Sequence, residues 1–337
     1  MHRRDGRTRR LARPRHRRPA AALAALLAGL LAFGQAACKE TPPPVLTPPQ
    51  PTYAEDSGAM IRLEDLRVLR DAPDSPRDLT VIAKRGDARL RRRAAFAIGR
   101  VGDPSGRPAL EALLADPEAV VRQAAAFGLG LLGDKAAVPA LLGVLNGDAS
   151  PLVRGRAAEA LGLIGDASAA APIGTYVAGL IAAGALANVP ADELGWPLAP
   201  EVDACRLGIY ALVRLKAPDA LLPAILDADG KPRSEWWPIA FALRRTEDPR
   251  TLAPMQLLLK GNGFYSAAFA AQGLGASKQP AVAVPPLLDV LASPTPRAAV
   301  RLQAVRGLGK LGDERAVAPL IALLDDCLLY TSPSPRD

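Results

Sequence analysis

Small and aliphatic residues recur in regular blocks along most of this chain. The stretch LRRRAAFAIGRVGDPSGRPALEALLADP is followed by VVRQAAAFGLGLLGDKAAVPALLGVLNGD, and AVRLQAVRGLGKLGDERAVAPLIALLDD comes near the end. In each block the pattern VxxxAAxxLGxxG places small and apolar residues on one face of a helix, and a second, shorter apolar run follows. The pattern predicts pairs of packed helices.

A Gly-Asp step closes the first helix in four of these blocks. The steps are Gly102-Asp103, Gly133-Asp134, Gly165-Asp166 and Gly312-Asp313. The first three are 31 and 32 residues apart. Glycine accepts the left-handed conformation that ends a helix, and aspartate caps the next helix. Because neither helix of a pair buries its apolar face alone, the pairs are expected to stack.

Three further segments, 205–226, 234–259 and 265–291, align with the same unit in weaker form. They bring the total to about seven units, and MIRLEDLRVLRD is typical of an N-terminal capping helix. We therefore predict an all-α fold, an α-solenoid of about seven helical-hairpin repeats over residues 55–326.

One insertion, residues 185–203, interrupts the repeat and contains three prolines and Trp196. Loops of this length inside a regular solenoid are often functional. We expect this loop to pack Trp196 on the solenoid. Further on, Trp236 and Trp237 open a helix, and we expect one of them in the core and the other at the groove.

The repeated motif resembles HEAT repeats of the short type first associated with phycobilisome lyases. The resemblance covers about three quarters of the chain and implies a superhelical binding scaffold. It also implies that the VRxxAAxxLG helices line the concave surface of the solenoid.

One outward position, just before each Ala/Gly-Leu-Gly step, is mostly aromatic in these helices. The residues assigned to it are Phe96, Phe127, Glu159, Tyr210, Phe241, Phe269 and Arg306. Five of these seven are aromatic, in a chain with only 4% aromatic residues. One interpretation is a stripe that holds an extended peptide or an apolar helix face, since aromatic anchors are enriched at binding hot spots. The other is that each ring fills space between adjacent helices, and the sequence leaves both open.

Charged residues accompany this stripe. Arg93, Arg100 and Arg306 flank it and are assigned to the same partner-binding surface, although a solvated helix face is the simpler interpretation. A second set of charges recurs with the repeat, and we expect it to form a structural ladder of hydrogen bonds. Its members are Arg91, Arg122, Arg154, Arg301, Asp103, Asp134, Asp166 and Asp313.

The first 37 residues combine an Arg-rich start with an apolar run, which is typical of a secretory signal peptide. Gln35-Ala36-Ala37-Cys38 resembles a bacterial lipobox, which implies lipidation of Cys38 and anchoring in a membrane of the periplasm or outer membrane. Cleavage without a lipid is the alternative, and the protein is then secreted. Residues 38–54 are rich in proline and read as a linker.

The last eleven residues, 327–337, break the preceding pattern. CLLYTSPSPRD is similar to the translation of a transposase-based sequencing adapter, so we expect a non-native tail and a native chain that continues beyond residue 326. The stretches IRLEDLRVL, RRAAFAIGRVGD and WWPIAFALRR also resemble bacterial lipoproteins in which HEAT repeats precede a cyclophilin-type peptidyl-prolyl isomerase. The alternative function is therefore the client-binding region of a truncated isomerase.

Charge and composition exclude several functions. The formal charge is +8, but residues 1–37 hold nine Arg and one Asp, and the rest balances 33 basic against 33 acidic residues. This balance argues against nucleic acid as the partner. Both histidines lie in the same leader, so we predict no catalytic residues, no metal and no cofactor. Cys205 is expected to be a buried, inert thiol.

The function predicted from the sequence is therefore a non-catalytic, monomeric scaffold of the cell envelope. It binds a protein or extended peptide on its concave face, and it reaches the membrane through Cys38.

Overall fold

The computed structural model describes residues 53–293 and 297–323. These residues form sixteen α-helices and five short 3-10 turns, without a β-strand, inside one compact unit that begins at Pro51. The all-α prediction is thus confirmed. The predicted leader and tail, with Cys38, lie outside the described residues, as does the predicted linker except for Tyr53 and Ala54, which start a helix.

Seven helices carry the VxxxAAxxLG pattern or its weaker forms, and we call them the motif helices. They are α3 (Ala88–Val101), α5 (Ala119–Leu132), α7 (Pro151–Ile164), α9 (Pro200–Arg214), α11 (Trp237–Thr246), α13 (Phe264–Ala276) and α15 (Ala298–Leu311). Each is followed by a return helix. The return helices are α4 (Arg107–Leu113), α6 (Val138–Gly147), α8 (Ala170–Ala182), α10 (Pro218–Ile225), α12 (Leu252–Lys260), α14 (Pro280–Ala292) and α16 (Val317–Ala322).

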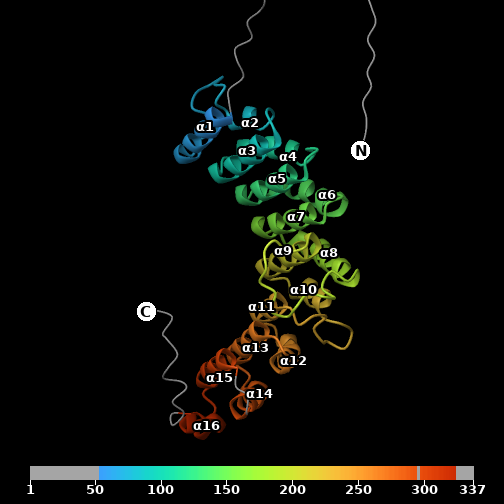
Figure 1. The fold of residues 1–337 in the computed structure, drawn as a ribbon, viewed down its shortest axis with the longest axis vertical. Helices are drawn as coiled ribbons and strands as arrows, with labels where there is room; N and C mark the ends of the chain where they lie inside the picture. Colours follow the sequence, from blue (N-terminus) through green and yellow to red (C-terminus); the bar gives the residue numbers. More distant parts are fainter. Residues whose placement is uncertain (1–52, 294–296, 324–337) are drawn as a thin grey trace, which may run out of the picture. The chain divides into compact units, whose positions relative to one another are not determined.

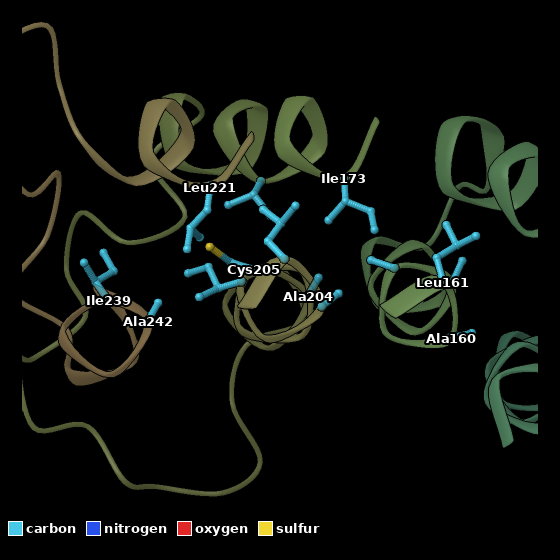
Figure 2. Packing of buried hydrophobic residues seen from close by; sticks show 14 of the residues in the cluster. Ala160, Leu161, Ile173, Ala204, Cys205, Leu221, Ile239 and Ala242 are labelled. Atoms are coloured by element: carbon cyan, nitrogen blue, oxygen red, sulfur yellow. The ribbon is translucent and has the colours of Figure 1, made fainter. Parts of the chain in front are cut away.

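The seven hairpins stack in order, so that motif helices form one layer and return helices the other (Figure 1). The hydrophobic core lies between the layers. In the central repeats, Leu161 and Cys205 of motif helices approach Ile173 and Leu221 of return helices, and all four side chains are buried (Figure 2). The predicted α-solenoid of about seven helical hairpins is therefore confirmed.

Two helices precede the first hairpin, α1 (Tyr53–Leu66) and α2 (Leu79–Ile82). Helix α1 packs on α3 and covers the core at this end, with Met60 and Leu63 fully buried. This is the capping helix predicted from MIRLEDLRVLRD, but it starts earlier and ends at Leu66.

A residue with a left-handed backbone follows every motif helix, within two residues of its last helical residue. Four of these residues are the glycines of the Gly-Asp steps, with φ between 63° and 77°. In the three weaker repeats the same place is taken by Lys216, Glu247 and Lys278, with φ of 52° to 56°. The hairpin turn is therefore kept where its glycine is missing, at a cost of about 1–2 kcal/mol for each side chain in this conformation.

Glu247→Gly is expected to raise the free energy of unfolding by about 0.5–1 kcal/mol, because glycine removes the strain of the left-handed conformation. The measurement is urea denaturation. Glu247→Ala is the matched control, since it removes the same charge but keeps a Cβ. A gain from Glu247→Ala as large as that from Glu247→Gly would contradict the backbone explanation.

Adjacent motif helices approach each other at glycine. A Cβ added to Gly99 of α3 would lie 2.7 Å from the Cα of Gly128 in α5, and one added to Gly162 would lie 2.7 Å from the Cα of Ala211. Such distances are shorter than real contacts between carbon atoms, so these positions require the absence of a side chain. The small residues of the repeat therefore set the spacing within the motif-helix layer.

Candidate functional site

The aromatic stripe predicted from the sequence forms two groups of contacting rings. Phe96 of α3 and Phe127 of α5 meet edge to face with ring centroids 5.9 Å apart. Tyr210 of α9 and Phe241 of α11 meet in the same way at 5.2 Å. All four rings are partly buried. The rings thus fill space between neighbouring motif helices, as one interpretation predicted, and they also keep part of their surface exposed, as the other requires.

In the sixth repeat the predicted register was wrong. Gly275 of α13 packs on Gly307 of α15 as Gly99 packs on Gly128, which places Gln272, not Phe269, at the repeat position of Phe96. Lys278 at the left-handed turn leads to the same register. The physical reason is that the close contact of small residues decides the alignment, and the Gly-Leu-Gly step of this repeat lies one helical turn beyond the phenylalanine.

Phe269 nevertheless joins the second group of rings. Its centroid lies 5.8 Å from that of Phe241 and 6.0 Å from that of Trp237. Trp237 donates a hydrogen bond of 2.9 Å from Nε1 to the carbonyl of Glu193, while Trp236 is buried in the core at 1% exposure. The expected division between the two tryptophans is therefore confirmed for the core residue. We call Phe96, Phe127, Tyr210, Phe241, Phe269 and Trp237 the aromatic row.

Glu159 of α7 separates the two groups. Its carboxylate accepts a hydrogen bond of 2.7 Å from Arg156, with which it forms an ion pair. The Arg156 guanidinium also lies over the ring of Phe127, 6.0 Å from its centroid. Because the carboxylate is neutralised within its own helix, the third repeat continues the surface with a compact polar pair in place of a ring.

Arginine side chains lie over the rings of the aromatic row. The pairs are Arg92 over Phe96 at 5.7 Å, Arg206 over Tyr210 at 5.6 Å, and Arg244 over Phe241 at 5.7 Å and Phe269 at 5.5 Å. These distances are within the range of cation–π attraction. The sequence interpretation missed Arg206 and Arg244 as members of this surface. Their signal was the spacing of three or four residues from an aromatic residue, which places both on one helix face.

The three arginines assigned to the surface from sequence differ in their contacts. Arg93 holds the Glu64 carboxylate of α1 with both terminal nitrogens, and Arg100 reaches the same carboxylate at 3.7 Å. Arg93 therefore joins the capping helix to the first repeat. Arg306 is exposed on α15 and makes no ion pair with any of the described residues. Whether Arg93, Arg100 or Arg306 touches a partner stays a prediction.

The insertion borders the second group of rings. Helix α9 begins at Pro200, so the loop covers residues 183–199. Asp192 accepts hydrogen bonds of 2.6 and 2.8 Å from the backbone N–H groups of Phe264 and Tyr265, which start α13. The carbonyl of Ala191 accepts another, of 2.8 Å, from the backbone N–H of Trp237.

Trp196 does not pack on the solenoid as predicted. It is 68% exposed, and its described contact is the guanidinium of Arg206 at 5.8 Å from the ring centroid. The loop is anchored by Asp192 and by backbone hydrogen bonds instead, so it needs no buried tryptophan. The prediction failed because it assumed that the largest apolar side chain would hold the loop.

The repeated arginines form hydrogen bonds between turns, but their partners differ from the prediction. Arg91 binds Asp116 with distances of 2.6 and 3.0 Å, and Arg122 binds Asp148 with 2.7 and 3.0 Å. Arg154 donates to the carbonyl of Leu145 at 2.6 Å. The acceptors thus lie at the ends of return helices. The aspartates of the Gly-Asp steps instead accept a backbone N–H two residues on, because they cap the 3-10 turn that begins there.

Cys205 is fully buried in α9, and burial raises its pKa to about 12, which fits the predicted inert thiol. No three His, Cys, Asp or Glu side chains gather as a metal site would require in residues 53–293 and 297–323. None of the helices in this part of the chain is long and apolar enough to cross a membrane.

Comparison with known proteins identifies the repeat. The family model of HEAT repeats matches residues 107–175 and 251–328, and that of the PBS lyase HEAT-like repeat matches residues 90–116. These matches confirm the resemblance drawn from the sequence. No curated protein sequence matches the chain.

Several solved structures are similar. The Escherichia coli protein YibA is 17% identical with a TM-score of 0.51, over 85% of this chain and 94% of that one. The complex of CpcE and CpcF of phycocyanin lyase from Nostoc sp. is 23% identical with a TM-score of 0.42, over 77% and 97%. Human deoxyhypusine hydroxylase in complex with glycerol is 22% identical with a TM-score of 0.29, over 80% and 91%. The likeness to YibA extends to the fold alone.

Proposed function

We propose that this chain, an α-solenoid of HEAT repeats, is a non-catalytic scaffold that holds an extended segment of another protein along its aromatic row. Solenoids of this kind present long surfaces because each repeat adds an equivalent helix to the same layer. The observation that carries the proposal is the aromatic row itself. Its rings contact one another across successive motif helices and keep exposed surface in a chain that has few aromatic residues.

The row has the properties of a binding hot spot. Aromatic side chains provide large contact area with little loss of conformational freedom, and arginines beside them add polar contacts. Arg92, Arg206 and Arg244 already lie over rings of the row, so a partner meets a surface whose side chains are held in place. Such preorganisation lowers the cost of binding.

We place this scaffold in the cell envelope, as a lipoprotein anchored through Cys38. The support is the sequence of residues 1–54, with its basic start, apolar run, lipobox-like step and proline-rich linker. The linker would hold the solenoid away from the membrane surface, where its motif-helix layer can reach partners.

Phe127→Ser and Phe241→Ser are expected to reduce recovery of the partner at least tenfold, because each removes an anchor from one group of the row. Recovery is measured by affinity purification of the tagged chain from its own envelope fraction with quantitative mass spectrometry. Because both rings are only partly buried, we expect each variant to lose about 1–2 kcal/mol of stability, less than the 3–5 kcal/mol of a fully buried ring.

Leu257→Ser is the matched control, since Leu257 is 47% exposed on the return helix α12. It should leave partner recovery unchanged. Equal recovery of all proteins by the wild type and by both phenylalanine variants would contradict the proposal. A loss of about 3–5 kcal/mol in the free energy of unfolding of each variant would also contradict it, because that is the cost of removing a fully buried ring.

A further inference from the structure

Charge is segregated within the fold although the body of the chain is neutral. The seven motif helices contain fifteen Arg and Lys but only three Asp and Glu. Most acidic residues lie in turns and loops, where several cap helices. The overall balance of charge, which argued against nucleic acid as the partner, therefore hides a basic motif-helix layer.

Part of this positive charge has no acidic partner. Arg91, Arg122 and Arg206 are neutralised by Asp116, Asp148 and Asp203. Six other cations of the motif helices make neither an ion pair nor a hydrogen bond with any described residue. They are Arg92, Arg214, Arg244, Arg245, Arg306 and Lys310. Several of these lie in the last turn of a helix, where they complement its dipole, and a solvated position explains them.

Arg244 is the exception, because it is not solvated in this way. Its guanidinium lies over both the Phe241 and the Phe269 ring, 5.7 and 5.5 Å from their centroids, and its Nε is buried without a hydrogen-bond partner among the described residues. Burial, followed by the charge of Arg245, lowers the pKa of Arg244. A partly buried guanidinium with an unpaired N–H and a second cation as neighbour is costly unless an anion joins it.

We propose that Arg244, with Arg245 beside it, binds a carboxylate of an extended acidic polypeptide whose apolar side chains lie on the aromatic row. This inference rests on the proposed function and specifies the chemistry of the partner. The planar guanidinium suits a carboxylate, and the flanking rings suit apolar neighbours of the acidic residue. Arg92 at one end of the row and Arg306 beyond the other extend the same charge preference.

A polypeptide fits this surface better than a nucleic acid. Bases bind by stacking flat on aromatic rings. The phenylalanine and tyrosine rings of the row instead meet one another edge to face at 62° to 78°, and only Trp237 lies closer to parallel with its neighbour, at 30° to Phe269. Each of these contacts takes up part of the ring surface on which a base would stack. The one partly buried guanidinium beside these rings that has no acidic partner in the described part of the chain also suits an isolated carboxylate better than a continuous phosphate backbone.

The test is selection of a phage-displayed library of random peptides on the purified full chain, followed by fluorescence anisotropy with the enriched peptides. We expect enrichment of Asp or Glu flanked by apolar residues. Arg244→Met should lower affinity for these peptides about tenfold, and Arg244→Lys should lower it less, because the charge remains but the planar fork is lost. Lys260→Met on α12 removes a charge from the return-helix layer and should change nothing.

The outcomes separate this inference from the proposed function. The carboxylate site is overturned if the enriched peptides lack acidic residues, or if acidic peptides bind Arg244→Met as tightly as the wild type. If Phe241→Ser still loses peptide binding in that case, the proposed scaffold function stands. Binding that is insensitive to Phe241→Ser overturns both. Tighter binding of a fluorescein-labelled oligothymidylate than of the acidic peptides, lost in Arg244→Met, overturns the polypeptide in favour of a nucleic acid.

Discussion

Gly99→Ala is expected to lower the free energy of unfolding by about 2–3 kcal/mol, although alanine is the better helix former. The added Cβ would lie 2.7 Å from the Cα and 2.8 Å from the carbonyl oxygen of Gly128. Both are backbone atoms, so no side chain can turn away, and α3 and α5 must separate. Stacked repeats depend on the contact with their neighbours, and the separation weakens that contact directly. The measurement is urea denaturation followed by circular dichroism.

Gly309→Ala is the matched control within the same chain. Gly309 has the repeat position of Gly99, but a Cβ there meets nothing within 4 Å. The substitution should therefore stabilise α15 by about 0.5–1 kcal/mol through helix propensity alone. If Gly99→Ala and Gly309→Ala change the free energy of unfolding in the same direction, the close approach of α3 and α5 is not what requires glycine at residue 99.

Arg122→Met is expected to cost about 3–5 kcal/mol, because it leaves a buried carboxylate without its cation. The Asp148 side chain is 7% exposed and the Arg122 side chain 16%, with two N–O contacts of 2.7 and 3.0 Å. Arg122 also donates to the carbonyls of Asp116 and Pro117, at 2.9 and 3.0 Å, and so joins the turns on both sides of its repeat. Arg89→Met is the control, since the Arg89–Asp87 pair is exposed and worth at most about 1 kcal/mol.

At acidic pH the difference in free energy of unfolding between the wild type and Arg122→Met should become smaller. Burial opposes ionisation of Asp148, but hydrogen bonds from Arg122 and Ser150 outweigh it and lower the pKa of Asp148. A lowered folded-state pKa means that the stabilisation is present above the unfolded value of about 3.9 and is lost as the pH falls through the folded value. Denaturation at pH 7 and pH 3 measures this. A difference of equal size at both pH values would assign the loss to packing.

The fold was predictable from the sequence because each repeat contains local signals for its own helices and turn. The apolar spacing of VxxxAAxxLG and the Gly-Asp step identify a helix and its end without reference to the rest of the chain. Where the step is missing, at Lys216, Glu247 and Lys278, only the helical pattern remained, and the turn forms because packing on both sides determines it. The number of repeats was therefore predictable, and the register of the sixth was not.

The candidate site was predictable to a lesser degree. Phe96, Phe127, Tyr210 and Phe241 share a repeat position, so a pattern found them. Trp237 and Phe269 lie at other positions and join the row only because α11 and α13 bring them within 6.0 Å. Contacts of Arg244 with rings from two helices depend on the spacing of those helices, which no local pattern encodes.

The arginine ladder shows the same limit. Recurrence with the repeat predicted a structural role for Arg91 and Arg122, and their ion pairs fit it. The partner aspartates follow return helices whose lengths vary, so Asp116 and Asp148 do not recur with a fixed spacing in the weaker repeats. The more conspicuous Gly-Asp aspartates were chosen instead.

The loop of residues 183–199 changes how this solenoid responds to tension. In a regular solenoid each repeat contacts only its neighbours, so a force applied to the two ends is expected to separate the repeats one at a time. This loop leaves the third repeat, passes the fourth, and is fastened to α11 of the fifth at Trp237 and to α13 of the sixth through Asp192. A pull along the chain must therefore break these fastenings before the enclosed repeats can lengthen. The segment from the third to the sixth repeat should therefore resist extension more than the rest of the solenoid. This segment contains Arg244 and the second group of rings.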